Sequence, residues 1–195
     1  LLQALAEWSA GRLRIVQGDA LKADEAGLLA HDGPASVVSN LPYNVGTPLL
    51  VKWLKAGAWR GPMTLMFQKE VAQRIVAQPG SGAYGRLAVL AQARCACRLE
   101  FTVPARAFTP PPKIASAVVR LSDSAEPYQH LDALERVTAA AFGQRRKMLR
   151  AALRALTPDP APLLEAAALA PTARAEDIDQ AGFRRLAEAW RARAV

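Results

Sequence analysis

Cysteine and histidine are scarce in this sequence, with two of each among 195 residues. Cys95 and Cys97 lie in an alanine-rich stretch that predicts a helix, and they are distant in sequence from His31 and His130. This spacing matches no familiar metal-binding motif, so we expect no metal site. Because disulfides are rare in the cytosol, the two cysteines indicate reduced, structural thiols in a cytoplasmic protein.

The sequence also lacks a long apolar run, since charged residues interrupt every stretch that approaches the length needed to cross a bilayer. The beginning of the chain has no methionine and no basic segment ahead of an apolar one, so it does not resemble a signal peptide. We therefore expect a soluble protein without a membrane partner. Its length is sufficient for one domain and a second, smaller one.

Acidic residues are outnumbered by basic ones, which gives a formal net charge of +8 and a pI near 10.1. Such a charge favours a polyanionic partner, such as nucleic acid or an anionic membrane surface. The excess is spread over the whole chain rather than confined to one tail. Charge alone therefore discriminates weakly between partners.

Apolar periodicity predicts strands that alternate with helices over the first two thirds of the chain. Strands are expected at 13–17, 35–42, 63–68, 98–104 and 113–122, and helices at 1–10, 48–57, 69–78 and 84–97. This alternation favours an α/β fold with a doubly wound sheet of mostly parallel strands.

After residue 128 the periodicity is only helical. Helices are expected at 129–142, 145–156, 160–169 and 175–194. The sequence therefore predicts two domains: an α/β domain over 1–124 and a small all-helical domain over 125–195.

Two predicted strands end in polar residues, at Gly18-Asp19 and at Asn40-Leu41-Pro42-Tyr43. In open α/β sheets, ligands bind beyond the carboxyl ends of the strands. Asp19 alone is weak evidence, because an aspartate after a strand often caps a helix or forms a turn. Asn-Leu-Pro-Tyr is more informative, because a tyrosine after a proline is an unusual way to end a strand.

This motif could recognise the exocyclic amine of a nucleobase, which is a poor nucleophile because its lone pair is delocalised into the ring. Acceptance of its hydrogens by the Asn40 oxygen and by a backbone carbonyl held by Pro42 would free that lone pair. Stacking of Tyr43 on the base would contribute about 1–3 kcal/mol. The structural alternative is that Pro42 ends the strand and Tyr43 covers the core.

Five segments occur in order along the chain: Asn-Leu-Pro-Tyr, QKEVAQR, AYGRL, FTPPPK and GQRRK. Together they resemble the small-subunit ribosomal RNA adenine dimethyltransferases, which use S-adenosylmethionine, and the resemblance runs from about residue 13 to the C-terminus. It implies a Rossmann-like methyltransferase sheet without its first strands, followed by a helical RNA-binding domain. The implied substrate is two adjacent adenosines in a hairpin near the 3′ end of small-subunit ribosomal RNA. We expect a monomer that acts on the immature small subunit during ribosome biogenesis.

The resemblance also assigns roles to individual residues. Asp19 and Ala20 would lie beside the adenine of the methyl donor, together with Asn40. A flipped target adenine would be held by the catalytic residues, which are Asn40, Leu41, Pro42, Tyr43 and Phe108. Phe108 would stack on the side of the base opposite Tyr43. Without the resemblance, Phe108 would be interpreted as an aromatic residue of the core.

The basic run RRKMLRAALR offers arginines at helical spacing, which predicts a phosphate-binding face. The alternative is an ordinary solvated helix face. The predicted RNA-binding residues are Arg145, Arg146, Lys147, Arg150, Lys113 and Arg86, with Arg154, Lys69 and Arg74 as further candidates.

The sequence departs from the family pattern in three respects. Gly46 stands where a serine or threonine is expected, and Ala115 where an aspartate is expected. The 195 residues contain no Gly-rich strand–turn–helix for the methionine part of the donor, so we expect this polypeptide alone to bind S-adenosylmethionine weakly and to be inactive.

Two alternative functions remain open: a large-subunit methyltransferase of the macrolide-resistance type and a non-catalytic ribosome-assembly factor. The FTPPPK and GQRRK segments favour the small-subunit enzyme over the large-subunit one.

Overall fold

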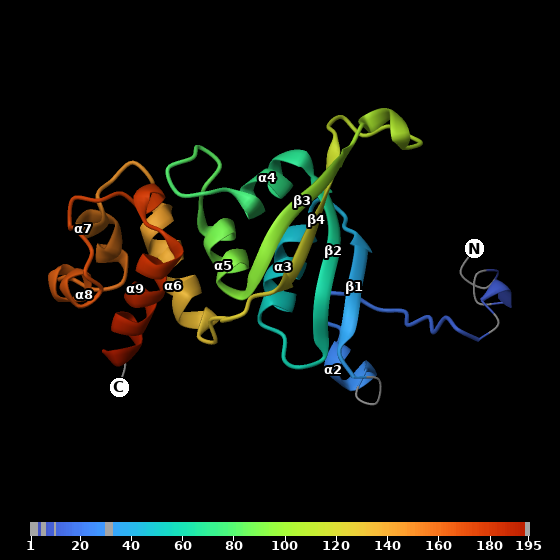
Figure 1. Ribbon diagram of the computed structural model, residues 1–195, viewed down its shortest axis with the longest axis horizontal. Helices are drawn as coiled ribbons and strands as arrows, with labels where there is room; N and C mark the ends of the chain where they lie inside the picture. Colours follow the sequence, from blue (N-terminus) through green and yellow to red (C-terminus); the bar gives the residue numbers. More distant parts are fainter. Residues whose placement is uncertain (1–3, 5–6, 10, 30–32, 194–195) are drawn as a thin grey trace.

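The structure of the protein is a computed structural model, and it describes residues 4, 7–9, 11–29 and 33–193 (Figure 1). Most of the predicted helix over 1–10, and His31, lie outside the described residues. None of the helices in the described part of the chain is long and apolar enough to cross a bilayer.

Four strands form one mixed sheet in the order β1-β2-β4-β3. Their bounds are Ala35–Asn40 for β1, Arg60–Gln68 for β2, Cys95–Val103 for β3 and Ser116–Asp123 for β4. β1 and β2 are parallel, whereas β4 is antiparallel to both β2 and β3. The α/β class is therefore confirmed, but the expectation of mostly parallel strands is wrong for the described sheet. The β3–β4 connection over 104–115 holds only the short 3-10 helix Ala105–Ala107, too little to carry the chain back for a parallel pairing.

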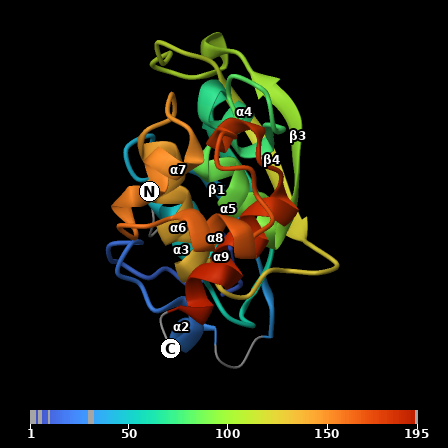
Figure 2. The ribbon, with the colours of Figure 1, turned by 90° about the vertical axis from the view of Figure 1, so that its left-hand side faces the viewer.

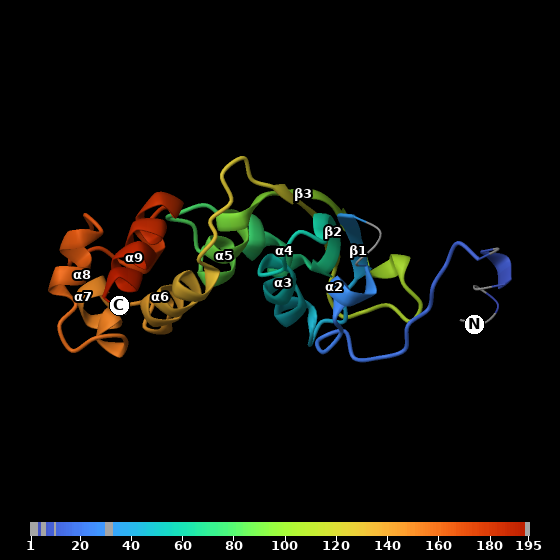
Figure 3. The same ribbon diagram turned by 90° about the horizontal axis from the view of Figure 1, so that it is seen from below.

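Three helices cover one face of the sheet, as Figures 1 and 3 show. They are α3 (Gly46–Leu54), α4 (Lys69–Val76) and α5 (Arg86–Arg94), close to the helices expected from the sequence. Leu50 of α3 and Leu65 of β2 are fully buried in the core between these layers. On the opposite face Val38 is 78% exposed and Phe101 is 58% exposed, so that face of the sheet is open to solvent in the described structure.

The last part of the described chain is helical (Figure 2). It contains α6 (Leu131–Gly143), α7 (Leu149–Ala152), α8 (Ala161–Ala166) and α9 (Gln180–Ala192). Tyr84, just before α5, is fully buried, and its hydroxyl donates a hydrogen bond to the Ile178 carbonyl oxygen at 2.9 Å. Its ring meets Phe142 of α6 edge to face. The helices therefore pack directly on the sheet part, and the division at residue 124 stays a prediction.

The strand expected at 13–17 is not formed. Leu13, Ile15 and Val16 are exposed and lie in irregular backbone ahead of the short helix α2 (Glu25–Leu28). A strand needs a neighbour to satisfy its backbone hydrogen bonds. Within the described residues no strand pairs with this segment, so its apolar pattern alone does not produce one.

The helix expected at 84–97 ends earlier, and Cys95 and Cys97 belong to β3 instead. They pair with Asp123 and Leu121 of β4. Pairing with a central strand therefore outweighs the helix preference of the alanine-rich sequence. Neither cysteine forms a disulfide among the described residues, in agreement with the expected structural thiols.

The single helix expected at 145–156 is also wrong. Residues 144–147 form a turn, and α7 begins only at Leu149. The Leu149 and Arg150 N–H groups donate to the carbonyl oxygens of Ala173 (2.8 Å) and Pro171 (3.2 Å). These contacts satisfy the first N–H groups of α7 from a distant segment and set its start.

The final helix begins later than expected. Ala175–Asp177 is a separate 3-10 turn, and α9 starts at Gln180. The Asp179 side chain accepts a hydrogen bond from the Gly182 N–H at 2.7 Å, which makes it the N-cap. The acidic residues at 176–179 therefore form a 3-10 turn and the N-cap of α9, and they are not part of the helix itself.

Burial predicts low thiol reactivity, because it raises the pKa of Cys95 to about 11 and that of Cys97 to about 12. At pH 8 the thiolate fraction of Cys95 should be about a hundredfold below that of an exposed cysteine. We expect an aromatic disulfide reagent to label the native protein slowly and both thiols immediately after unfolding in denaturant. Rapid labelling of the native protein would contradict the buried placement.

Candidate functional site

The Asn-Leu-Pro-Tyr motif lies where β1 leaves the sheet. Asn40 is the last residue of β1, and the Leu41 N–H still donates to Met66 of β2 at 3.3 Å. The Pro42 carbonyl oxygen then accepts from the Val45 and Gly46 N–H groups at 3.2 and 3.0 Å. These two bonds hold the turn that leads into α3.

Two acceptors of this turn remain available. The Asn40 side chain and the Leu41 carbonyl oxygen make no hydrogen bond with any described residue. Leu41 is only 3% exposed, and a carbonyl in such a position usually has a partner. Asn40 itself is exposed, so the pair forms a polar edge beside the carboxyl end of β1 that has no hydrogen-bond partner among the described residues.

Gly46 is explained by local packing. A Cβ at this position would lie 3.3 Å from Leu41 Cβ and 3.3 Å from the Phe67 ring. That is tighter than a normal contact, so the first turn of α3 can approach the motif closely because residue 46 has no side chain. The departure from the expected serine or threonine therefore has a structural reason in this chain.

Tyr43 and Phe108 approach the same edge from different parts of the chain. Tyr43 is 44% exposed, and a hydrogen bond of 3.1 Å joins its hydroxyl to that of Ser116, the first residue of β4. Phe108 is half-buried in the 104–115 loop, whose two ends, Val103 and Ser116, pair in register. Their rings are not in contact in the described structure.

Ser116 is a residue that sequence reasoning missed. It is 1% exposed and starts a strand that is otherwise mostly apolar. The only signal in the sequence was a hydroxyl at that strand start. Its partner is 73 positions away, so the contact could not be read from spacing.

Asp19 and Ala20 lie in the exposed segment before α2. One carboxylate oxygen of Asp19 accepts from the Leu21 N–H at 2.9 Å, as a turn-forming aspartate does. The Ala20 carbonyl oxygen accepts from Lys52 Nζ at 2.8 Å, and Lys52 also pairs with Glu25. No hydrogen bond among the described residues joins Asp19 or Ala20 to Asn40, and their cofactor role stays a prediction.

The predicted RNA-binding residues divide into two groups. Arg86 forms an ion pair with Glu135, and Arg145 pairs with Glu176 at 2.9 Å and donates to the Gly82 carbonyl oxygen at 3.0 Å. The second group is exposed and makes no ion pair within the described chain; its members are Arg146, Lys147, Arg150 and Lys113.

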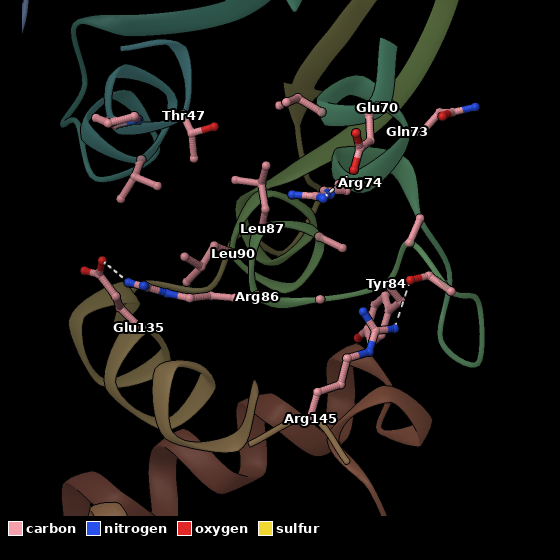
Figure 4. A pocket seen from close by; sticks show the side chains of 17 residues that line it. Thr47, Glu70, Gln73, Arg74, Tyr84, Arg86, Leu87, Leu90, Glu135 and Arg145 are labelled. Carbon is pink, nitrogen blue, oxygen red and sulfur yellow. Dashed lines mark hydrogen bonds and ion pairs between the residues drawn. The ribbon is translucent and has the colours of Figure 1, made fainter. Parts of the chain in front are cut away.

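Arg86 and Arg145 line a cleft of about 1010 Å³ between α3, α4, α5 and α6 (Figure 4). Leu87 and Leu90 contribute apolar surface, and Glu135 is paired with Arg86 at one wall of the cleft. Its charges are therefore largely balanced. In the described part of the chain, no group of three histidine, cysteine or acidic residues could hold a metal ion.

Comparisons with known proteins identify the family. A family model described as "Ribosomal RNA adenine dimethylase" matches residues 1–190. The chain belongs to this family. "Ribosomal RNA small subunit methyltransferase A" of Phenylobacterium zucineum is 62% identical over 196 residues, covering 99% of this chain and 67% of the relative. The protein of the same name from Caulobacter vibrioides is 62% identical over 191 residues, covering 97% of this chain and 72% of the relative.

Two solved structures share the fold of this adenine dimethylase. A dimethyladenosine transferase from Plasmodium falciparum aligns with a TM-score of 0.74 at 22% identity, covering 95% of this chain and 75% of that one. The 23S rRNA methyltransferase ErmE aligns with a TM-score of 0.63 at 25% identity, covering 97% of this chain and 77% of that one. The expected Rossmann-like methyltransferase fold is therefore confirmed. The chain spans about two thirds of the length of the relatives it matches.

The two arginines of the GQRRK motif should differ in their effect on stability. Arg145→Ala removes a half-exposed ion pair and a bond to a carbonyl, and should lower the free energy of unfolding by about 1 kcal/mol. Arg146→Ala, the matched control, removes an exposed charge and should change it by less than about 0.5 kcal/mol. Urea denaturation monitored by circular dichroism measures both. Equal effects would mean that the Glu176 contact contributes nothing.

Proposed function

We propose that this chain carries the substrate side of an S-adenosylmethionine-dependent enzyme that dimethylates two adjacent adenosines in a hairpin near the 3′ end of small-subunit ribosomal RNA. Membership of the adenine dimethylase family supports the reaction. Identity of 62% to proteins named small subunit methyltransferases supports the substrate. The structural observation that carries the proposal is the pair of unpartnered acceptors at Asn40 and Leu41.

The reaction requires a nucleophilic nitrogen. The Asn40 side-chain oxygen and one backbone carbonyl accept the two hydrogens of the target amine, which frees its lone pair for bond formation. The Pro42 carbonyl oxygen already accepts hydrogen bonds from two N–H groups of the next turn, so the Leu41 carbonyl is the better acceptor. As the nitrogen bonds to the methyl carbon, the donor's sulfur–methyl bond would break to leave a neutral thioether. The alkylated nitrogen would then lose its proton to water, so no strong base is needed.

The methyl donor, S-adenosylmethionine, supplies an electrophilic methyl group. Residues of this chain fit polar contacts to it: the Asn40 side chain is unpartnered, and the second carboxylate oxygen of Asp19 accepts nothing from the described residues. Asp19 and Ala20 would hold its adenine part. Asn40 would lie beside both the donor and the target amine.

The target base would be held between Tyr43 and Phe108. A base inside a helix cannot present its amine to this edge, so the adenosine must flip out of its stack. The exposed part of Tyr43 and the half-buried Phe108 offer two aromatic surfaces to the flipped base. Each stacking contact contributes about 1–3 kcal/mol.

The RNA backbone would be bound by the exposed cations of the helical part and of the Phe108 loop. Arg146, Lys147, Arg150 and Lys113 are free of ion pairs within the described chain, so they can contact phosphate without first losing a carboxylate partner. Arg86 and Arg145 would contribute less. We further infer that the protein acts as a monomer in the cytoplasm, on the immature small subunit during ribosome biogenesis.

A large-subunit methyltransferase is the alternative substrate class, because the fold of ErmE is also similar. With the full-length protein, we expect methyl transfer to purified small-subunit particles from cells that lack the modification, and none to large-subunit RNA. Radiolabelled S-adenosylmethionine and digestion to nucleosides would identify dimethyladenosine. Label in the large-subunit RNA would overturn the substrate assignment, and no label in either RNA would favour a non-catalytic assembly factor.

Asn40→Ala in the full-length protein should lower the rate of methyl transfer by at least about a hundredfold, because the amine loses one of its two acceptors. Binding to the particle should change little, since the RNA backbone contacts remain. Asn44→Ala is the matched control, because Asn44 is exposed and makes no side-chain bond to a described residue. Turnover by Asn40→Ala at the wild-type rate would refute the role of Asn40.

Arg146→Ala combined with Lys147→Ala should weaken RNA binding and reduce the slope of log affinity against log salt by about 1 to 2. The reason is that each phosphate contact releases a counterion. Arg136→Ala with Arg191→Ala removes the same charge elsewhere on the helices and should leave the slope unchanged. Filter binding at several salt concentrations measures the slope for both double variants. Equal slopes would mean that Arg146 and Lys147 lie on a solvated surface that does not bind phosphate.

A further inference from the structure

Ser116 lies at the sheet edge that carries the Asn-Leu-Pro-Tyr motif, and it is one of the few buried polar residues in the described chain. Its residue exposure is 1%, and its hydroxyl is hydrogen-bonded to Tyr43 Oη at 3.1 Å. A buried hydroxyl requires a partner. Here that partner is the hydroxyl of the ring that, in the proposed function, stacks on the target base.

The backbone of Ser116 lies at the base of the loop that carries the second aromatic residue. Ser116 pairs with Gln68 of β2 on one side and with Val103 of β3 on the other. Val103 and Ser116 are the two ends of the loop that carries Phe108, which is the yellow-green segment at the top of Figure 1. One residue therefore closes the Phe108 loop through its backbone and holds Tyr43 through its side chain.

We propose that Ser116 is a positioning residue that orients the Tyr43 ring relative to the Phe108 loop. This inference rests on the proposed function for the identity of the stacked base. Tyr43 is 44% exposed, so packing restrains its ring incompletely. A hydrogen bond to the hydroxyl fixes the far end of the ring and so restrains χ1 before the base arrives, and this reduces the entropy that stacking would otherwise lose.

Kinetics of the full-length protein test this role through four variants. Ser116→Ala and Tyr43→Phe should each lower kcat/KM for methyl transfer about three- to tenfold, the range that one net hydrogen bond supplies. The double variant should be no slower than either single one, because both remove the same bond. Ser122→Ala is the control: Ser122 lies on the same strand, and its hydroxyl makes no bond to a described residue.

Two kinetic results would overturn the proposal. One is a Ser116→Ala enzyme with the wild-type kcat/KM, and the other is a double variant in which the two losses multiply. Tyr43→Phe keeps the buried serine and changes a partly exposed position, so it tests the bond even if Ser116→Ala fails to fold.

A second measurement does not depend on methyl transfer. In the full-length protein labelled with 3-fluorotyrosine, Tyr43→Phe assigns the fluorine resonance of Tyr43. Tyr84 and Tyr128 bond to Ile178 and Glu188 and serve as internal references. Ser116→Ala should move only the Tyr43 resonance toward that of a solvated tyrosine. An unmoved resonance would refute the positioning role, whereas a wild-type enzyme without methyl transfer would count only against the proposed function.

Discussion

The antiparallel pairing of β4 with both β2 and β3 is the constraint on which the site depends. Gln68, Ser116 and Val103 lie side by side in that register, so the ends of β2 and β3 and the start of β4 meet at one edge. β1 joins the same edge because Asn40 pairs with Met66 of the parallel strand β2. Residues separated by long stretches of sequence thereby surround one space, and the ladder hydrogen bonds hold them there.

Local bonding then decides which polar groups at that edge can bind a ligand. The Pro42 carbonyl is occupied by the first N–H groups of α3, and Gly46 allows this turn to close against Phe67. The same closure leaves the Leu41 carbonyl and the Asn40 amide without partners in the described chain. The Pro42 carbonyl therefore stabilises the turn, while the Leu41 carbonyl stays available as an acceptor. Recognition of an amine in the proposed function requires such a free acceptor.

The sequence predicted the local structure around Asn40 well, because the information there is local. Strand β1, its exit through Asn40 and Pro42, and the helix that follows are encoded within about twenty neighbouring residues, and each has its own short-range signal. Predictions failed where distant pairing competes with propensity: Cys95 joins β3 because β4 lies beside it, and the turn at 144–147 forms because α7 bonds to 171–173. Ser116 was missed for the same reason, since its partner is known only once the sheet is assembled.

Charge illustrates the limit of composition. The net charge of +8 indicates a polyanionic partner, but an arginine that already pairs with a glutamate contributes little to binding phosphate. Exchanging the carboxylate for a phosphate at Arg86 or Arg145 would gain little, since exposed ion pairs are worth about 0–1 kcal/mol, and would leave Glu135 or Glu176 beside the incoming anion. The unpaired cations at Arg146 and Lys147 carry no such penalty. We therefore expect RNA affinity to depend on where the carboxylates lie, and the balanced cleft beside α5 to be a less favourable phosphate site than the turn that follows α6.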